Sequence, residues 1–188
     1  MSVEIEAKLK VESLEPVRER LVAADAEFLR AVTERNLHFD SADGRLRAAD
    51  SVLRIRSVVV HRGAEAPSKL TYKGARLPGK VKRRTEIELD IADAPTAGRL
   101  LEALGFTLVS EIEKRRETWR LGSCHVELDE VPYLGTFVEI EGPDEKAIAV
   151  VQEALGLAHL SHIKEGYVAL LLDHCRRNNL PIRQIAFA

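Results

Sequence analysis

The chain has little cysteine, little aromatic side chain and little net charge. Its 188 residues include two cysteines, Cys124 and Cys175, which show neither CxxC nor Cys/His spacing. Neither a disulfide framework nor a zinc site is therefore expected, and reduced thiols in a cytoplasmic location are the default expectation. The net charge of −2 argues against broad nucleic-acid binding, which requires a basic surface.

Long apolar segments are also lacking. No hydrophobic run approaches the length that a membrane span needs, and the first residues, MSVEIEAK, contain no apolar signal segment. We therefore expect neither a membrane partner nor a secretory signal. With 45% hydrophobic and 31% charged residues, the chain is long enough to form one globular domain with a sizeable core.

What the chain does contain is charge arranged at strand spacing. In the stretch from Val3 to Val11, apolar residues occupy every second position, and Glu4, Glu6 and Lys8 occupy the positions between them. A period of two residues is typical of a β-strand with two unlike faces. The same alternation predicts further strands at residues 36–40, 51–60, 68–74, 83–91, 113–121, 124–131 and 136–142.

Helices are predicted between groups of strands. Helical spacing of apolar residues, together with Pro and capping residues at the starts, predicts helices at about 13–28, 93–105, 143–156 and 165–176. The connections between most strands are short, so the strands should be antiparallel. The order of strand, helix and strand meander occurs twice, which suggests two half-barrels in an α+β fold.

The charged faces of seven strands suggest what the barrel contains. A single strand of this kind is most simply explained by a solvent-exposed face, as in many antiparallel sheets. Seven such strands, with acids and bases sorted by strand, instead favour a barrel whose charged faces point inward. A barrel of about eight strands encloses one small ligand. Bases bind phosphate oxygens and carboxylates bind a divalent metal, so both together suit a polyphosphate that binds with Mg²⁺ or Mn²⁺.

The sequence also resembles a known family. Glu4-Ile5-Glu6-Ala7-Lys8 matches the ExExK signature of the CYTH superfamily, also called triphosphate tunnel metalloenzymes. The similarity continues in order through residues 38–56, 70–74, 83–90, 113–119, 126–142 and 166–172. The chain resembles most the class IV adenylyl cyclase-like branch. Where the family commonly has Ser before the closing tyrosine, this chain has Gly166 before Tyr167.

The resemblance implies a single CYTH domain over residues 1–188. It implies an eight-stranded antiparallel barrel with a charged interior, a triphosphate tunnel, covered outside by about four helices. The C-terminal helix at about 165–176 would pack on the tunnel or cap it.

The resemblance also implies roles for individual residues. Glu4, Glu6 and Lys8 would be catalytic. The ligands of Mg²⁺ or Mn²⁺ would be Glu4, Glu6, Asp129, Glu139 and Glu141. The triphosphate would be bound by Lys8, Arg54, Arg56, Lys73, Arg84, Lys114, Arg116 and Lys164. The rest of the tunnel lining would include Glu86, Glu88 and Glu127.

Two reactions fit this set of residues. Water attacking a terminal phosphorus would hydrolyse a nucleoside triphosphate, inorganic triphosphate or thiamine triphosphate, and we favour this reaction because it requires no base pocket. The alternative is a class IV adenylyl cyclase that converts ATP to cyclic AMP and pyrophosphate. A non-catalytic polyphosphate- or nucleotide-binding module is a further alternative, disfavoured by the intact set of carboxylates. The expected partner is a small-molecule triphosphate rather than nucleic acid or membrane, and an exposed helix face leaves a homodimer open.

Overall fold

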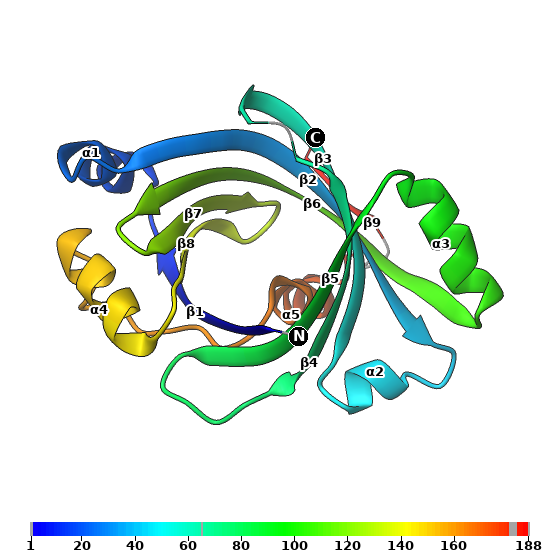
Figure 1. Cartoon of the computed structure of the whole chain (residues 1–188). Coiled ribbons are helices and arrows are strands. Elements are labelled where there is room, and N and C mark those ends of the chain that lie inside the picture. Colours follow the sequence, from blue (N-terminus) through cyan, green and yellow to red (C-terminus); the bar gives the residue numbers. More distant parts are fainter. Residues whose placement is uncertain (1, 65, 181–183, 188) are drawn as a thin grey trace.

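The computed structural model describes residues 2–64, 66–180 and 184–187. Eight of the nine strands in this described part form a closed antiparallel barrel in the order β2-β3-β4-β5-β1-β8-β7-β6, and pairing of β2 with β6 closes the ring (Figure 1). The ninth strand, β9, pairs in parallel with β6. The strands are β1 Ser2–Val11, β2 Glu27–Ser41, β3 Val52–Gly63, β4 Ser68–Arg76, β5 Lys82–Ile91, β6 Phe106–Leu121, β7 Cys124–Val131, β8 Gly135–Glu141 and β9 Gln184–Ile185. The predicted α+β antiparallel barrel is confirmed.

Five helices accompany the barrel in the described part of the chain. They are α1 Glu15–Ala23, α2 Arg45–Ala48, α3 Ala94–Ala103, α4 Glu145–Ala154 and α5 Tyr167–Asn178. Four of these correspond to the predicted helices, and the single turn α2 is additional. Among the described residues, none of the helices combines the length and the apolar character that crossing a membrane requires.

The first half of the barrel differs from the prediction. The helix expected over 13–28 ends at Ala23, and the strand expected over 36–40 begins already at Glu27. Phe28 has helical spacing from Val17 and Leu21, yet its ring packs edge-on against Trp119 at a centroid distance of 5.0 Å. Pairing of β2 with β6 along almost its whole length outweighs the local spacing, and the same pairing starts β6 at Phe106 rather than at residue 113.

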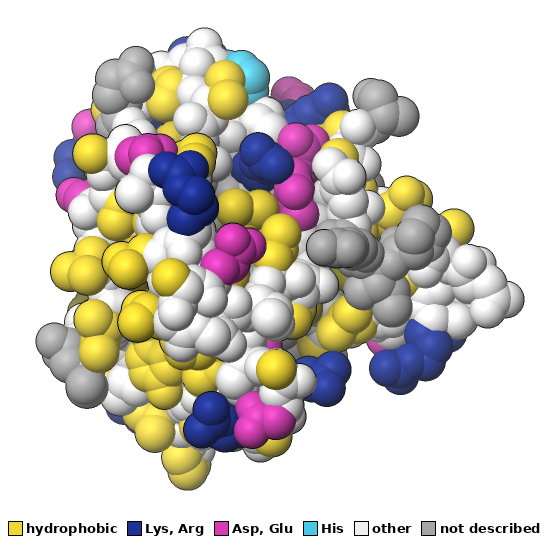
Figure 2. All heavy atoms as spheres, turned by 90° about the vertical axis from the view of Figure 1, so that its right-hand side faces the viewer, with side chains coloured by type: hydrophobic (Ala, Val, Ile, Leu, Met, Phe, Trp, Pro, Cys, Tyr) yellow, Lys and Arg dark blue, Asp and Glu magenta, His cyan; other side chains and the backbone are white. Residues whose placement is uncertain are grey.

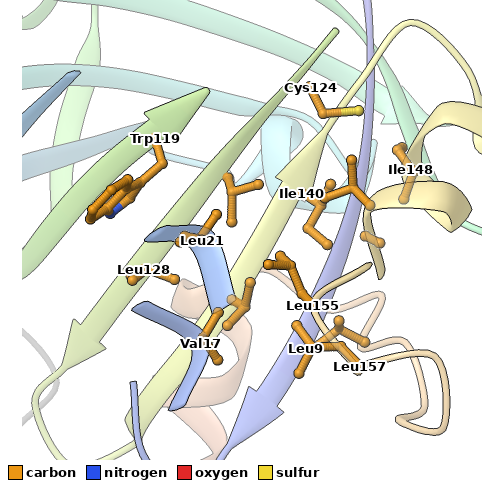
Figure 3. Close-up of a cluster of buried hydrophobic side chains, with 14 of the residues drawn as sticks. Leu9, Val17, Leu21, Trp119, Cys124, Leu128, Ile140, Ile148, Leu155 and Leu157 are labelled. Atoms are coloured by element: carbon orange, nitrogen blue, oxygen red, sulfur yellow. The ribbon is translucent and has the colours of Figure 1, made fainter. Parts of the chain in front are cut away.

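The outer face of the barrel carries the main hydrophobic core. Leu9, Val126 and Ile140 point outward from β1, β7 and β8, and each is fully buried. Helices α1 and α4 cover them with Leu21 and Ile148 (Figure 3). The apolar half of each alternating strand therefore lies under helices, as the sequence pattern predicts.

Helix α5 lies at the inner side of the barrel rather than outside it (Figure 1). Its buried residues Leu171 and Cys175 pack against Ile112, Val131 and Phe137. These three residues lie on the inward faces of β6, β7 and β8, because they share strand parity with the charged residues of those strands. One end of the barrel is consequently filled by an apolar plug.

The surface seen in Figure 2, on the side of α3, shows a different distribution of charge. Basic and acidic side chains are scattered there among hydrophobic ones. Helix α3 itself exposes Leu100 and Leu104, whose exposed fractions are 58% and 66%. On this face the basic residues do not gather into a broad patch. The concentrated charge of the chain lies instead on the inward faces of the strands.

Candidate active site

The barrel encloses a central cavity of about 1110 Å³. Its wall contains most of the residues that the sequence predicts for a site. Those on the wall are Glu4, Glu6, Lys8, Arg54, Arg56, Lys73, Arg84, Glu86, Glu88, Lys114, Arg116, Glu127, Glu139 and Glu141. The alternation of each strand thus brings side chains from seven strands into one space.

The acidic side of the cavity begins with β1, where each glutamate is paired with a lysine. Lys73 Nζ lies 2.6 and 2.7 Å from the two carboxylate oxygens of Glu4. Lys82 Nζ lies 2.6 Å from Oε1 of Glu6. Burial disfavours the charged form of Glu4, but Lys73 and Lys82 outweigh it and lower the Glu4 pKa to about 2.

Glu139 on β8 is held by two cations. Lys8 Nζ lies 3.2 Å from its Oε1 and Arg116 Nη2 lies 2.6 Å from its Oε2. Burial opposes ionisation of Glu139, yet the charges of Lys8 and Arg116 keep its pKa well below the ordinary value. Lys8 also donates to the backbone oxygen of Glu165 at 2.9 Å and lies 4.0 Å from the ring centroid of Tyr167.

Glu141 has the opposite electrostatic environment. It lies directly across from Glu6 in the β1–β8 register, so two carboxylates face the same space. Burial, together with repulsion from Glu4 and Glu6, raises the Glu141 pKa to about 7. A cation bound between these carboxylates would relieve this repulsion and favour the charged form of Glu141.

The basic side of the cavity lies on β3, which carries Arg54 and Arg56. The Nε and Nη2 atoms of Arg54 are buried and have no hydrogen-bond partner among the described residues, and the same is true of Nε of Arg56. Burial and the neighbouring Arg56 lower the Arg54 pKa to about 10. Arg56 has one acidic partner, since its Nη1 lies 3.2 Å from Oε1 of Glu34.

Asp129 on the neighbouring strand β7 holds Arg116 and Lys114 of β6 in place. The guanidinium of Arg116 donates to both oxygens of Asp129, at 2.6 and 2.5 Å, and Lys114 donates to the same carboxylate at 3.1 Å. The hydroxyl of Tyr167, the first residue of α5, adds a hydrogen bond of 2.8 Å. Four donor contacts on one fully buried carboxylate give these two bases a defined orientation.

Three predicted site residues occupy positions that differ from the rest. Asp129 points inward from β7 but is fully buried against the bases that engage it and does not line the cavity, so a metal could reach it only by displacing them. Lys164 is exposed and lies outside the cavity wall, with Nζ 3.4 Å from the backbone oxygen of Gly79. Arg84 lies on the wall, but Nη1 binds the backbone oxygens of Asp50 and Gly74 at 2.6 and 2.9 Å. The roles expected for these residues stay predictions.

Three further side chains belong to the site and were not predicted. Glu34 is 2% exposed and lies near Arg56, Lys114 and Arg116, whose charges overcome burial and hold its pKa well below the ordinary value. Lys82 was missed because the predicted strand began one residue later, although it shares the parity of the other inward residues of β5. If the strand predicted at 36–40 had been extended to begin at Glu27, as β2 does, its alternation would have placed Glu34 on the inward face. No local sequence signal marks the contact of Tyr167 with Asp129.

The oxygen ligands of the acidic side suit a hard divalent cation such as Mg²⁺ or Mn²⁺. Glu4, Glu6 and Glu141 are adjacent across β1 and β8, and burial, followed by repulsion from Glu4 and Glu6, raises the pKa of Glu141. Within residues 2–64, 66–180 and 184–187, however, no three ligand-type side chains are already gathered at metal-binding distances. The donor chemistry fits the metal, and in this structure Lys73 and Lys82 engage the oxygens of Glu4 and Glu6.

Fold and site together define a class of protein, an eight-stranded antiparallel barrel whose cavity concentrates acids and bases. The family model for the CYTH domain matches residues 2–167, and the chain belongs to this family. The resemblance inferred from the sequence motifs is therefore confirmed.

Individual relatives agree with the family assignment. A protein of Methanocaldococcus jannaschii named "putative adenylate cyclase" is 28% identical over 177 residues, which cover 89% of this chain and 98% of that protein. The structure of PH1819 from Pyrococcus horikoshii OT3 is 28% identical, with a TM-score of 0.77 over 90% of this chain and 98% of that one. HpAC1 from Hippeastrum, described as having a dominant triphosphatase activity, is 22% identical with a TM-score of 0.68 over 95% and 97% of the two chains, a likeness that shows the fold alone.

Proposed function

We propose that the protein is a divalent-metal-dependent enzyme that binds a triphosphate in the central cavity and hydrolyses it. The observation that carries this proposal is the set of unpartnered buried guanidinium nitrogens on Arg54 and Arg56. A buried donor without an acceptor is costly, and phosphate oxygens entering the cavity would supply acceptors for these nitrogens. A polyphosphate supplies several anionic oxygens along one line, which matches bases on several neighbouring strands.

The basic and acidic side chains of the cavity bind different parts of the ligand. Arg54 and Arg56 bind phosphate oxygens from β3, and Arg116 and Lys114 bind them from β6 in an orientation set by Asp129. A divalent metal on the acidic side, held by Glu4, Glu6, Glu139 and Glu141, would neutralise phosphate charge and polarise the phosphorus–oxygen bond that breaks. The plug formed by α5 excludes water from one end of the cavity.

A second reaction, cyclisation of ATP to cyclic AMP and pyrophosphate, is favoured by the size and lining of the cavity. Its volume of about 1110 Å³ slightly exceeds the typical volume of a site for a drug-sized ligand, about 300–1000 Å³, so a whole nucleotide would fit. Part of its wall is apolar, with Leu46, Val109 and Leu172 available to contact a nucleobase. The name of the M. jannaschii relative supports the same alternative.

One experiment separates these functions. The protein is incubated with ATP, inorganic triphosphate and thiamine triphosphate, each with Mg²⁺ or Mn²⁺, and the products are resolved by chromatography. Orthophosphate released only with metal supports the hydrolase, whereas cyclic AMP with pyrophosphate identifies the cyclase. Tight binding with every substrate unchanged would overturn both activities and indicate a binding module.

A further inference from the structure

Lys82 lies on the acidic side of the cavity, beside carboxylates rather than among the arginines. It begins β5 and lies directly opposite Glu6 in the β1–β5 register. Its Nζ lies 2.6 Å from Oε1 of Glu6, and the two side chains are only 11% and 7% exposed. Glu4 and Glu139 also attract this ammonium group. Lys82 is therefore surrounded by carboxylates that the proposed function assigns to the metal.

Two other lysines compensate the same group of carboxylates. Lys73 binds both oxygens of Glu4, and Lys8 binds Glu139. Each of the three glutamates is thus neutralised from within the chain. A divalent cation and an ammonium group compete for the same oxygens, because like charges repel strongly in a site shielded from water.

The geometry also indicates what relieves this competition. An anionic triphosphate in the cavity offers oxygens to lysines that now bind glutamates. A lysine that turns from its glutamate to a phosphate oxygen keeps an anionic partner and leaves the carboxylate free. Without the anion, the same movement would leave a buried ammonium group unpaired, which is costly.

We propose that Lys82 is an internal counter-cation that holds Glu6 in the empty cavity and keeps the affinity for a divalent metal low until a triphosphate enters. This inference rests on the proposed function, since it concerns the metal of the same site. It makes metal and triphosphate binding cooperative, and such coupling is reciprocal by thermodynamic necessity. The metal then binds together with the triphosphate rather than before it.

The test measures Mn²⁺ binding by isothermal titration calorimetry, without turnover. Lys82→Gln removes the charge and keeps a hydrogen-bond donor for Glu6, so it should bind Mn²⁺ at least tenfold more tightly than the parent protein when no anion is present. Lys82→Arg, which keeps the charge, should bind Mn²⁺ as weakly as the parent. Lys80→Gln makes the same change in charge at an exposed position outside the cavity wall and should leave the affinity unchanged.

A second arm adds imidotriphosphate, a triphosphate analogue that resists hydrolysis. The analogue should tighten Mn²⁺ binding to the parent protein at least tenfold, and by a clearly smaller factor in Lys82→Gln. The parent titrations require no variant, and circular dichroism confirms that each variant is folded.

The possible failures are distinguishable. Equal or weaker Mn²⁺ affinity of folded Lys82→Gln without anion, while the parent binds Mn²⁺ with the analogue, overturns the role of Lys82 and leaves the proposed function intact. An equal gain from the analogue in both proteins overturns it as well. A parent protein that binds no Mn²⁺ even with the analogue overturns the metal dependence of the proposed function, and the inference with it.

Discussion

The outer and inner faces of the barrel are built from the same strands but are held by different forces. On β1 and β8, Leu9 and Ile140 point outward under helices, whereas Lys8 and Glu139 point into the cavity. All four are almost completely buried. The outer pair gains free energy from burial, about 25 cal/mol for each Å² of apolar surface removed from water. The inner pair loses hydration, and the attraction between the two charges does little more than offset that loss.

This difference indicates why the inner face is charged. An apolar interior of the same volume would stabilise the fold at least as well, because buried ion pairs are weak contributors to stability. Charges that are buried without complete compensation, such as the guanidinium of Arg54, are better explained by a ligand. The outer face accounts for the stability of the barrel, and the inner face accounts for the proposed function. Four substitutions test this separation, in order of expected effect.

Glu6→Gln should produce the largest change, and that change should be in activity. It removes a charge from the proposed metal site while keeping the size of the side chain. We expect kcat/KM for the triphosphate substrate to fall by about a thousandfold, or about 4 kcal/mol, as measured by phosphate release at saturating Mn²⁺. Glu12→Gln, at an exposed position beyond the end of β1, is the control. Activity within tenfold of the parent would contradict the role of Glu6.

Arg54→Met should weaken ligand binding without weakening the fold. Loss of a buried charge-assisted contact should cost about 2–5 kcal/mol of binding free energy, measured by titration with imidotriphosphate. The stability to urea should stay equal or rise, because two guanidinium nitrogens of Arg54 lack a hydrogen-bond partner among the described residues and Arg56 repels the charge. Arg99→Met on the exposed side of α3 is the matched control. A large loss of stability with unchanged binding would show that Arg54 on the inner face serves the fold rather than the ligand.

Leu21→Ala should have the opposite effect, on stability rather than binding. Leu21 of α1 is fully buried against the outer face, so the cavity left by the substitution should lower the free energy of unfolding by about 2–5 kcal/mol. The affinity for imidotriphosphate should change little. Its neighbour Val22 is 63% exposed, and Val22→Ala should cost no more than about 0.5 kcal/mol. If the two substitutions lowered the free energy of unfolding in urea equally, Leu21 would not contribute to stability through the hydrophobic core on the outer face.

Glu34→Gln should have the smallest effect, and one that depends on pH. The pKa of Glu34 is well below its ordinary value of about 4.3, so its charge stabilises the folded state above about pH 4.3. That contribution is lost as the pH falls through the folded-state pKa, where Glu34 takes up a proton. Removing the charge should therefore cost about 1–3 kcal/mol of unfolding free energy at pH 7, and progressively less below about pH 4.

Urea unfolding at a series of pH values measures this effect. The exposed Glu19→Gln on α1 serves as the control and should show no such trend. A difference between Glu34→Gln and the parent that stays constant from pH 7 to pH 3 would be evidence against the charged pairing of Glu34 with its bases.

Much of the architecture was predictable from the sequence, but its long pairings were not. Alternation from Val3 to Val11 identified β1 and its two faces correctly, because period two is a local property of neighbouring residues. The stretch around Phe28 was wrongly predicted as helix, since its strand conformation depends on hydrogen bonds to β6, about ninety positions later. Strands that rely on such remote partners leave a weak local signal.

The candidate site, like the fold, was predictable only in part. Parity along each strand predicted that residues such as Glu4, Arg56 and Lys114 face one cavity, and the structure brings them together there. Parity could not reveal that Asp129 is saturated by bases. That arrangement depends on which strands are neighbours and on where α5 begins. Neither can be predicted from the spacing of residues along one strand.

The sequence by itself determined that this protein is a barrel with an apolar outside and a charged inside. Side-chain alternation is set by backbone geometry, so a single strand already shows which residues share a face. Only the tertiary structure decided how the charges are partnered. It paired Lys82 with Glu6, left Arg54 without a partner in the described chain and filled one end of the barrel with α5. The physical reason is that ion pairs and packing depend on distances across the ring, whereas strand faces depend only on neighbouring residues.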